Sequence, residues 1–191
     1  MRPFLIMILR GTLLCPSLLI FGSLLAQPVS AETCGRRKIH CECGDTVTEN
    51  RKLTQDLGTC RDVGLRVRSG VTLDCNGFVI RGRSSREGIL LQGVDGARVR
   101  NCEVSGFRFG IRVRAGRSSQ ISSNKLHGNY RGLSIGEEAE DIHAESNFIT
   151  KNRELGILVN PATENTHIYD NIVTENGRRN IDIRGARGLL L

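Results

Sequence analysis

Apolar and polar residues alternate in short runs along most of the chain. In residues 111–114 Ile and Val alternate with two Arg, and in residues 142–145 Ile and Ala alternate with His and Glu. Successive side chains of a β-strand point to opposite sides, so an alternation of this kind indicates a strand with one buried face. The runs predict strands of about four or five residues, two or three in each period of the chain.

A four-residue pattern, Gly-Ile-x-Val or a close variant, recurs at a regular interval. It begins at Gly64, Gly88, Gly110, Gly132, Gly156 and, in degenerate form, Asn180, with spacings of 24, 22, 22, 24 and 24 residues. A second series, Asn101, Asn124, Asn147 and Asn171, has spacings of 23, 23 and 24 residues. We expect these asparagines to stack at a corner and to hydrogen-bond the backbone of neighbouring coils. Such a repeat predicts a solenoid of about five to six coils.

A leucine-rich repeat is the main alternative, because its period is about 20–29 residues. The Leu-x-Leu string of that repeat is absent, and Ile and Val occupy the positions predicted to be buried. No period contains a run with helical spacing that is long enough for a packed helix. Stacked short strands therefore agree better with the pattern.

Two strings resemble those of a known group of proteins. Residues 71–82, VTLDCNGFVIRG, resemble the first coil of right-handed parallel β-helix repeat proteins, and the later Gly-Ile-x-Val and Asn-x-Ile strings resemble the coils that follow. Residues 43–47, CGDTV, resemble the leader of secreted bacterial members. The resemblance implies an all-β, right-handed parallel β-helix of the pectate-lyase-like and NosD-type superfamily. That group contains polysaccharide lyases, hydrolases and epimerases as well as periplasmic NosD-type proteins, so fold alone does not choose an activity.

The first 31 residues have the features of a signal peptide. Arg2 and Arg10 precede an uncharged apolar run, and Val29-Ser30-Ala31 provides the small residues of a cleavage site after Ala31. We therefore expect a secreted or periplasmic protein whose mature chain has no membrane span. Without the two signal-peptide arginines the formal charge falls from +7 to +5. This moderate charge and the absence of Trp argue against a nucleic-acid partner.

The cysteines after the signal peptide are grouped towards one end of the mature chain. There are six, and all lie in the N-terminal half of that chain: Cys34, Cys41, Cys43, Cys60, Cys75 and Cys102. An even number in an exported protein predicts three disulfides, and Cys43 with Cys60 is the preferred local pair among fifteen possible pairings. The alternative is a zinc site beside His40, but Cys41 and Cys43 have C-x-C spacing rather than C-x-x-C. We predict no metal or other cofactor, a Cys-rich cap over residues 32–63 and β-helix repeats over residues 64–191.

The outward positions of the repeated strands form two columns that contain five arginines. The first column is Arg66, Leu90, Arg112, Ser134, Leu158 and Asp182, and the second is Arg68, Gln92, Arg114, Gly136, Asn160 and Arg184. Arginine binds carboxylates with two parallel hydrogen bonds, so Arg66, Arg68, Arg112, Arg114 and Arg184 are the candidate ligand-binding residues for an acidic glycan. The alternative is a solvated surface that discourages aggregation at strand edges.

The sequence gives less support for a catalytic site than for a binding site. Glycoside hydrolysis needs paired carboxylates, and the two columns contain one acid, Asp182. Glu137, Glu138, Glu140 and Asp141 form one charged loop with no D-x-D spacing for calcium. His143 and His167 precede Asn147 and Asn171 by four residues each, which predicts solvent-facing strand histidines that become neighbours if the corners match. No catalytic residue is assigned.

We therefore expect a non-catalytic secreted or envelope protein that binds acidic polysaccharide. The alternative is a lyase or epimerase acting on a polyuronate. The last repeat begins at Asn180 and only eight residues follow Ile183. Three outcomes remain for the end of the solenoid: a fold-back of the final leucines, end-to-end self-association, or truncation relative to longer family members. The last two are favoured, because eight residues can hardly cover the end of a β-helix.

Overall fold

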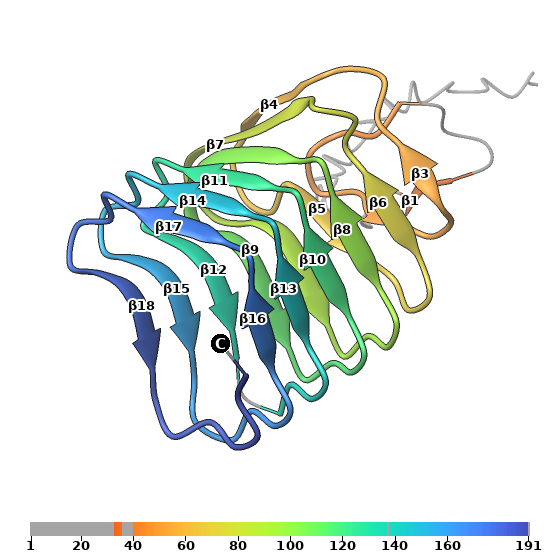
Figure 1. The fold of residues 1–191 in the computed structure, drawn as a ribbon. Coiled ribbons are helices and arrows are strands. Elements are labelled where there is room, and N and C mark those ends of the chain that lie inside the picture. Colours follow the sequence, from red (N-terminus) through yellow and green to blue (C-terminus); the bar gives the residue numbers. More distant parts are fainter. Residues whose placement is uncertain (1–32, 36–39, 137, 191) are drawn as a thin grey trace, which may run out of the picture. The chain divides into compact units, whose positions relative to one another are not determined.

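The structure is a computed structural model that describes residues 33–35, 40–136 and 138–190. Its strands stack as successive coils of a solenoid (Figure 1). A complete coil has three faces, each with one strand or half-strand, and every strand pair is parallel. The predicted signal peptide, residues 1–31, lies outside the described residues.

The first face carries the repeated Gly-Ile-x-Val strands. Its members are β2 (Thr46–Val47), β5 (Leu65–Val67), the second half of β7 (Val79–Gln92), the second half of β9 (Glu103–Arg114), β12 (Arg131–Ile135), β15 (Leu155–Val159) and β18 (Arg179–Ile183). β1 (Thr33–Cys34) pairs with β2. The pattern predicted each of the strands β5 to β18 on this face, because its buried positions alternate with polar ones.

The other two faces complete each coil. The second face is β3 (Arg51–Lys52), β6 (Thr72–Asp74), β8 (Arg98–Arg100), β10 (Gln120–Ser122), β13 (His143–Glu145) and β16 (His167–Tyr169). The third is β4 (Leu57–Cys60), the first halves of β7 and β9, β11 (Lys125–His127), β14 (Phe148–Thr150) and β17 (Ile172–Thr174). No helix occurs in the described ranges, and the prediction of an all-β parallel β-helix of five to six coils is confirmed.

The interior is a continuous apolar core in which equivalent residues of successive coils stack. On the second face the stacked residues are Leu73, Val99, Ile121, Ala144 and Ile168, all almost completely buried. Ile89, Ile111, Leu133 and Ile157 stack in the same way on the first face. Burial of this apolar area is the main stabilising term of the fold.

Two asparagine ladders join the coils at two corners. In the first ladder the side-chain oxygen of Asn147 accepts hydrogen bonds from the backbone and side-chain nitrogens of Asn124, while its amide donates to Ile121 O at 2.9 Å. The side-chain oxygen of Asn171 in turn accepts hydrogen bonds from the backbone and side-chain nitrogens of Asn147. Asn129, Asn152 and Asn176 form the second ladder at the next corner.

The prediction that Asn101 belongs to the first ladder is wrong. Cys102 occupies that position, since its backbone nitrogen donates to Asn124 Oδ1 at 3.0 Å. Asn101 is exposed, and its side chain donates instead to Asp74 Oδ1 at 3.0 Å. A cysteine that forms a disulfide has replaced the ladder asparagine in this coil, which a search for repeated asparagines cannot detect.

The repeated glycine of the Gly-Ile-x-Val pattern has a steric cause. A Cβ atom on Gly132 would lie 2.7 Å from the carbonyl oxygen of Gly156 in the next coil and 2.5 Å from a methyl group of Ile149. Real Cβ atoms do not tolerate such contacts, so a side chain there would force adjacent coils apart. The glycine thus fixes the close approach of the coils rather than a special backbone angle.

Three disulfides join the six described cysteines: Cys34–Cys41, Cys43–Cys60 and Cys75–Cys102. The preferred local pair, Cys43 with Cys60, is confirmed. The limit between a cap and the repeats at residues 63 and 64 stays a prediction. β2 and β3 already pair with β5 and β6. Within the part of the chain that the structure describes, no helix has the length and apolarity needed to cross a membrane.

Candidate functional site

Strand pairing brings the first predicted arginine column into register. Along the first face the paired residues are Arg66, Leu90, Arg112, Ser134, Leu158 and Asp182. In the second column Gln92 pairs with Arg114, while Arg68 and Arg184 directly follow β5 and β18. We call the outer surface of these two columns the arginine face.

Burial restricts the part of this face that a ligand can reach. Leu90, Ser134 and Leu158 alternate with core residues, as predicted for outward positions, yet their exposed fractions are only 7%, 1% and 1%. Leu90 and Leu158 do not belong to the main core cluster, and neither does Phe109. The guanidinium carbon of Arg112 lies 4.3 Å from the centre of the Phe109 ring. Apolar side chains thus form a second buried layer on the outer side of the sheet, and an arginine covers part of it.

Two of the five candidate arginines are paired with carboxylates of the protein. Arg112 Nη1 donates to Glu87 Oε1 at 3.2 Å. Arg184 donates to Asp182 Oδ2 through Nε at 3.0 Å and Nη2 at 2.8 Å, and Arg179 Nη1 donates to Asp182 Oδ1 at 2.9 Å. The hydrogen bonds from Arg184 are the main cause of the lowered pKa of Asp182. These pairs reduce the capacity of Arg112 and Arg184 to bind an external carboxylate.

Glu87 is a site residue that the sequence patterns did not identify. It precedes Gly88, so period-two alternation along residues 89–92 does not extend to it. It pairs in register with Phe109, is only 3% exposed, and lies against Arg112 on the outer side of the sheet. Burial and the positive charge of Arg114 lower the pKa of Arg112, and the contact with Glu87 opposes them.

The other three candidate arginines lie at the N-terminal part of the face. Arg66 and Arg68 line a hollow of about 450 Å³ together with Thr46, Gln92 and Val94. Arg66 Nη1 donates to the carbonyl oxygen of Gly44 at 2.9 Å, which holds its side chain in place. Among the described residues, Arg68 and Arg114 have no carboxylate partner.

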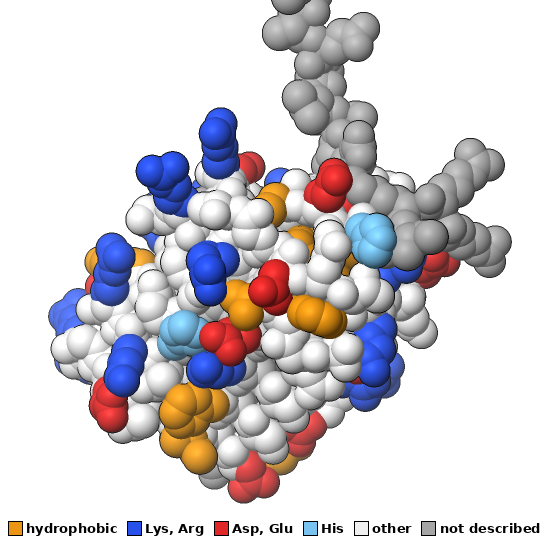
Figure 2. All heavy atoms as spheres, turned by 90° about the horizontal axis from the view of Figure 1, so that it is seen from above, with side chains coloured by type: hydrophobic (Ala, Val, Ile, Leu, Met, Phe, Trp, Pro, Cys, Tyr) orange, Lys and Arg blue, Asp and Glu red, His pale blue; other side chains and the backbone are white. Residues whose placement is uncertain are grey.

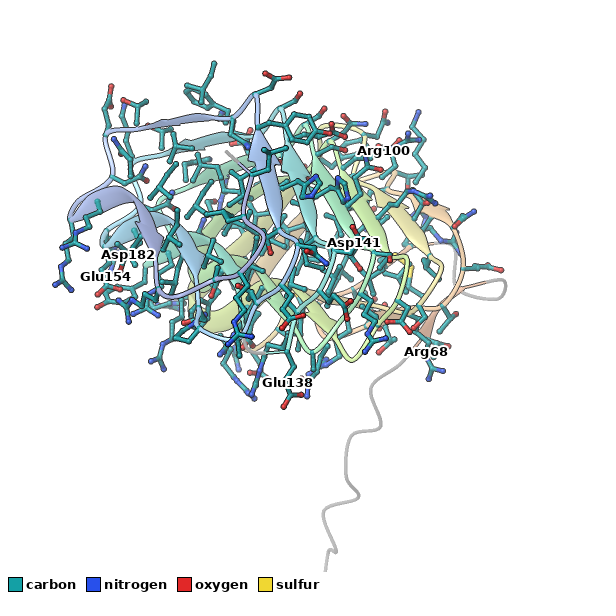
Figure 3. The ribbon with its side chains drawn as sticks, turned by 60° about the horizontal axis from the view of Figure 1, so that its bottom comes forward. Arg68, Arg100, Glu138, Asp141, Glu154 and Asp182 are labelled. Atoms are coloured by element: carbon teal, nitrogen blue, oxygen red, sulfur yellow. A yellow bond between two sulfur atoms is a disulfide. The ribbon has the colours of Figure 1, made fainter. Side chains whose placement is uncertain are left out.

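Figure 3 shows Arg68 towards one end of the solenoid and the paired acids Glu154 and Asp182 towards the other. The uncompensated positive charge of the arginine face is therefore concentrated near the disulfide-linked end. On the third face, by contrast, basic side chains are spread over the surface with acidic ones between them (Figure 2).

The two strand histidines are neighbours, because the corners of their coils match. His143 and His167 pair in register on the second face, and their ring centres lie 4.6 Å apart. Asp141 Oδ1 lies 3.1 Å from His143 Nε2, and Ser118 Oγ donates to Asp141 Oδ2 at 2.8 Å. The Ser118 hydrogen bond, followed by that of His143, lowers the pKa of Asp141. Beside them Glu145 accepts hydrogen bonds from Tyr169 and Gln120.

The acidic side chains of the predicted charged loop contact different partners instead of forming one group. Glu140 lies 3.1 Å from Arg117, while Asp141 contacts Ser118 and His143. Glu138 is exposed, and Glu137 lies outside the described residues. Across the described ranges no three His, Cys, Asp or Glu side chains are grouped as metal ligands.

The comparisons with known proteins agree with this architecture. A family model described as periplasmic copper-binding protein (NosD) matches residues 44–188, which is well over half of the chain. The chain belongs to the NosD family. NosD proteins are periplasmic, which agrees with the predicted secreted or periplasmic location, and the predicted NosD-type resemblance is confirmed. Searches of curated proteins and of solved structures gave no match.

Proposed function

We propose that this NosD-family protein is a non-catalytic envelope protein that binds an acidic polysaccharide at the arginine face. The observation that carries the proposal is the hollow lined by Arg66, Arg68 and Gln92. The residues that line it come from β2, β5 and β7 and from the positions directly after β5 and β7, and Arg114 lies on the next strand, β9. Guanidinium groups bind carboxylates with paired hydrogen bonds, and an amide such as Gln92 can bind sugar hydroxyls.

The spacing of these side chains suits a polymer. Arg68, Gln92 and Arg114 occupy equivalent positions on three successive coils, and parallel strands lie about 4.8 Å apart. The two arginines are therefore about 10 Å apart along the solenoid, on either side of a neutral hydrogen-bonding group. A chain of uronate residues that runs along the solenoid axis would meet a cation, an amide and a second cation in turn.

The acids of this face support binding rather than the alternative lyase or epimerase reaction. Glu87 and Asp182 are each held by arginine at 3.2 Å or less. Each carboxylate is therefore fixed in position by its arginine partner, and the arginines lower the pKa of Asp182 further, so neither acid is placed to transfer a proton to or from a bound sugar. The arginine face thus offers cations for recognition and no paired carboxyl groups of the kind that hydrolases use.

The description of the family names copper, but the described side chains of this protein do not provide a copper site. Copper sites use imidazole, thiolate and thioether ligands. All six described cysteines are in disulfides, and both methionines lie outside the described residues. His143 and His167 are adjacent, but no third ligand joins them in a metal-binding group within the described part. These residues do not fit a copper centre, so the proposal does not include one.

The test is binding of polygalacturonate to the protein with Arg68→Ala and Arg114→Ala combined. Loss of two charge-assisted contacts should weaken binding at least about tenfold, since each such hydrogen bond contributes roughly 1.5–3 kcal/mol. Added salt should weaken binding of the wild type as well. The matched control is Arg81→Ala with Arg98→Ala, two exposed arginines on the other faces. Equal affinity of wild type and the Arg68/Arg114 variant for polygalacturonate would refute the proposal.

A further inference from the structure

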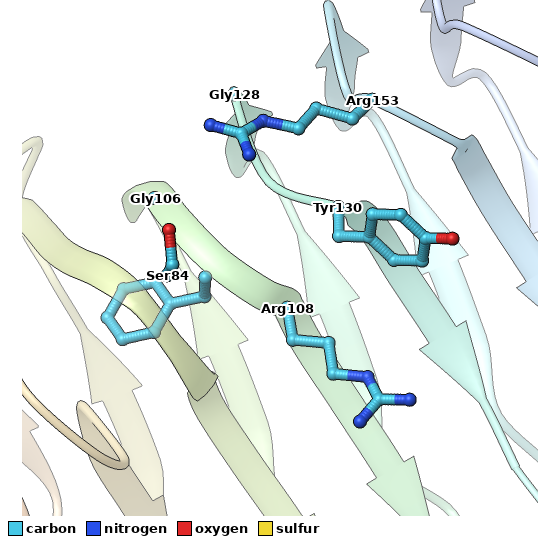
Figure 4. A pocket seen from close by; sticks show the side chains of 7 residues that line it. Ser84, Gly106, Arg108, Gly128, Tyr130 and Arg153 are labelled. Carbon is cyan, nitrogen blue, oxygen red and sulfur yellow. The ribbon is translucent and has the colours of Figure 1, made fainter.

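A second hollow lies at the corner between the third and first faces. It has a volume of about 350 Å³ and is lined by Ser84, Gly106, Phe107, Arg108, Gly128, Tyr130 and Arg153. In Figure 4 Arg153 reaches across Gly128, and Tyr130 lies between Arg153 and Arg108. This volume is in the range of small-molecule sites, which are about 300–1,000 Å³.

Register explains which side chains surround the hollow. Ser105, His127, Thr150 and Thr174 pair across successive coils, so the next residues, Gly106, Gly128, Lys151 and Glu175, occupy one corner position. Two residues further along, Arg108, Tyr130 and Arg153 form a second column. Gly106 and Gly128 line the hollow, whereas the later coils carry Lys151 and Glu175 at this corner, and these two exposed side chains lie 3.7 Å apart (Lys151 Nζ to Glu175 Oε2).

The backbone does not require glycine at Gly128. Its φ of 62° is close to those of Lys151, 54°, and Glu175, 53°, which carry side chains at the equivalent corner. A Cβ on Gly128 would meet no atom within 4 Å. Gly106 differs, because a Cβ there would lie 2.4 Å from Gly82 O. A side chain at position 128 would thus have room, and its backbone angle occurs at residues with side chains in later coils. The space beside Gly128 is open because this residue is glycine.

The chemistry of the lining is cationic and aromatic. Arg108 and Arg153 are exposed and have no carboxylate partner among the described residues. Tyr130 is 43% exposed, and its ring offers a flat apolar surface. Glu154, the acid next to Arg153 in the chain, accepts a hydrogen bond from Arg131, so its charge is balanced. Two guanidinium groups beside an aromatic ring suit a sugar ring that carries a carboxylate.

Phe109 lies between an arginine of the hollow and an arginine of the arginine face. The guanidinium carbons of Arg108 and Arg112 lie 5.6 Å and 4.3 Å from the centre of the Phe109 ring, from the corner and from the face respectively. We propose that the hollow is a second subsite, in which Arg108, Tyr130 and Arg153 bind one acidic sugar residue. This inference rests on the proposed binding of acidic polysaccharide and assigns to it a site outside the two predicted columns.

The test uses opposite charges at one position, Gly128→Glu and Gly128→Lys. Both side chains occur at this corner in later coils, so both variants should fold, which a thermal melt checks. The probe is methyl α-galacturonate, followed by chemical-shift titration, with the neutral methyl α-galactoside as its control. Gly128→Glu should weaken binding of the acidic sugar about tenfold or more, whereas Gly128→Lys should leave it within about threefold of wild type. Arg108→Ala with Arg153→Ala should reproduce the effect of Gly128→Glu.

Three results would overturn the subsite. They are wild type that does not bind the acidic monosaccharide, equal binding by wild type and Gly128→Glu, or equal loss in both Gly128 variants. The polymer separates this inference from the proposed function. If polygalacturonate binding depends on Arg68 and Arg114 but not on Gly128, only the subsite fails. If monosaccharide binding depends on Gly128 while polymer binding ignores Arg68 and Arg114, only the arginine face fails.

Discussion

The ion pair between Glu87 and Arg112 ties a buried carboxylate to the arginine face. Glu87 is 3% exposed, and its Oε2 has no hydrogen-bond partner, although Arg86 lies 3.7 Å away. The Arg112 side chain is 26% exposed and also covers Phe109. An arginine that sequence alone assigns to ligand binding therefore has a structural role, which consists of neutralising an acid and shielding an aromatic ring.

Arg112→Ala should destabilise the protein by about 2–3 kcal/mol, near the lower end of the range for a broken buried pair because Arg112 is partly exposed. The residual Glu87 carboxylate would remain buried without its partner. Glu87→Leu with Arg112→Leu should recover much of this loss, since a buried ion pair can be replaced by apolar groups. Urea unfolding at pH 7 measures both, and a double variant no more stable than Arg112→Ala would contradict the argument.

Glu154 provides a pH prediction at the same scale. The hydrogen bond from Arg131 is the largest cause that lowers the pKa of Glu154. A carboxyl whose pKa is lower in the folded state stabilises the fold above its unfolded pKa, and this contribution is lost as pH falls through the folded pKa. Wild type should therefore lose stability more steeply than Glu154→Gln between about pH 5 and pH 3. Urea midpoints across this range test it, and parallel curves would refute it.

At the scale of elements, the asparagine ladders hold adjacent coils in register. Each inner member accepts two hydrogen bonds from the coil before it and donates to a backbone carbonyl of that coil. Asn147 and Asn152 are only 1% exposed, so these polar groups lie away from water. A buried amide that satisfies four partners is replaceable only at the cost of leaving backbone groups without hydrogen bonds.

Asn147→Asp should destabilise the protein by about 2–4 kcal/mol, because a carboxylate cannot donate to Ile121 O or to Asn171 Oδ1. The control is Asn101→Gly, at an exposed position with φ 55° outside the ladder, which should change stability by less than about 1 kcal/mol. Urea unfolding of both variants at pH 7 is the measurement. A similar small effect in both would show that the ladder contributes little.

Much of this element structure could be predicted from the sequence, for identifiable reasons. Gly132 and its equivalents recur because adjacent coils leave no room for a Cβ, and Ile and Val recur because they stack inside. The register of Arg66, Leu90 and Arg112 could be predicted from the spacing of the repeated pattern. The role of Glu87 could not be predicted, since Glu87 lies before the glycine at which the strand alternation begins. The hollow at Gly128 could not be predicted either, because it depends on comparing one corner across four coils.

At the scale of the whole molecule, the disulfides concentrate covalent stabilisation at the N-terminal end. Cys34–Cys41 spans 7 residues, Cys43–Cys60 spans 17, and Cys75–Cys102 spans 27. A cross-link limits the freedom of the unfolded chain, and the effect grows with the length of the closed loop. The longest link also joins the corner after β6 to the next coil, where Cys102 takes the ladder position.

Replacing Cys75 and Cys102 by Ala should cost about 3.5 kcal/mol, against about 2.4 kcal/mol for Cys34 and Cys41, from loop length alone. Both pairs are almost completely buried, so the loss of packing is similar in the two variants. Thermal or urea unfolding under oxidising conditions gives the order. Six free thiols in protein isolated from its native compartment, or a reversed order of stability, would contradict this account.

The last described coil has two unpaired strand edges and exposed apolar side chains. β16 is covered in part by the C-terminal segment, because His167 pairs with Leu190 and Leu189 packs against the core. β17 and β18 pair only with the preceding coil, and Ile172, Ile181 and Ile183 are 59%, 38% and 37% exposed. Unpaired edges beside apolar groups favour pairing with another chain. We predict concentration-dependent self-association, measured by sedimentation velocity. Ile181→Lys with Ile183→Lys should shift the protein to monomer, and Val79→Lys, on the third face, serves as control. Wild type that stays monomeric at all concentrations would mean that this end remains closed to other copies, so that the exposed isoleucines have no role in assembly.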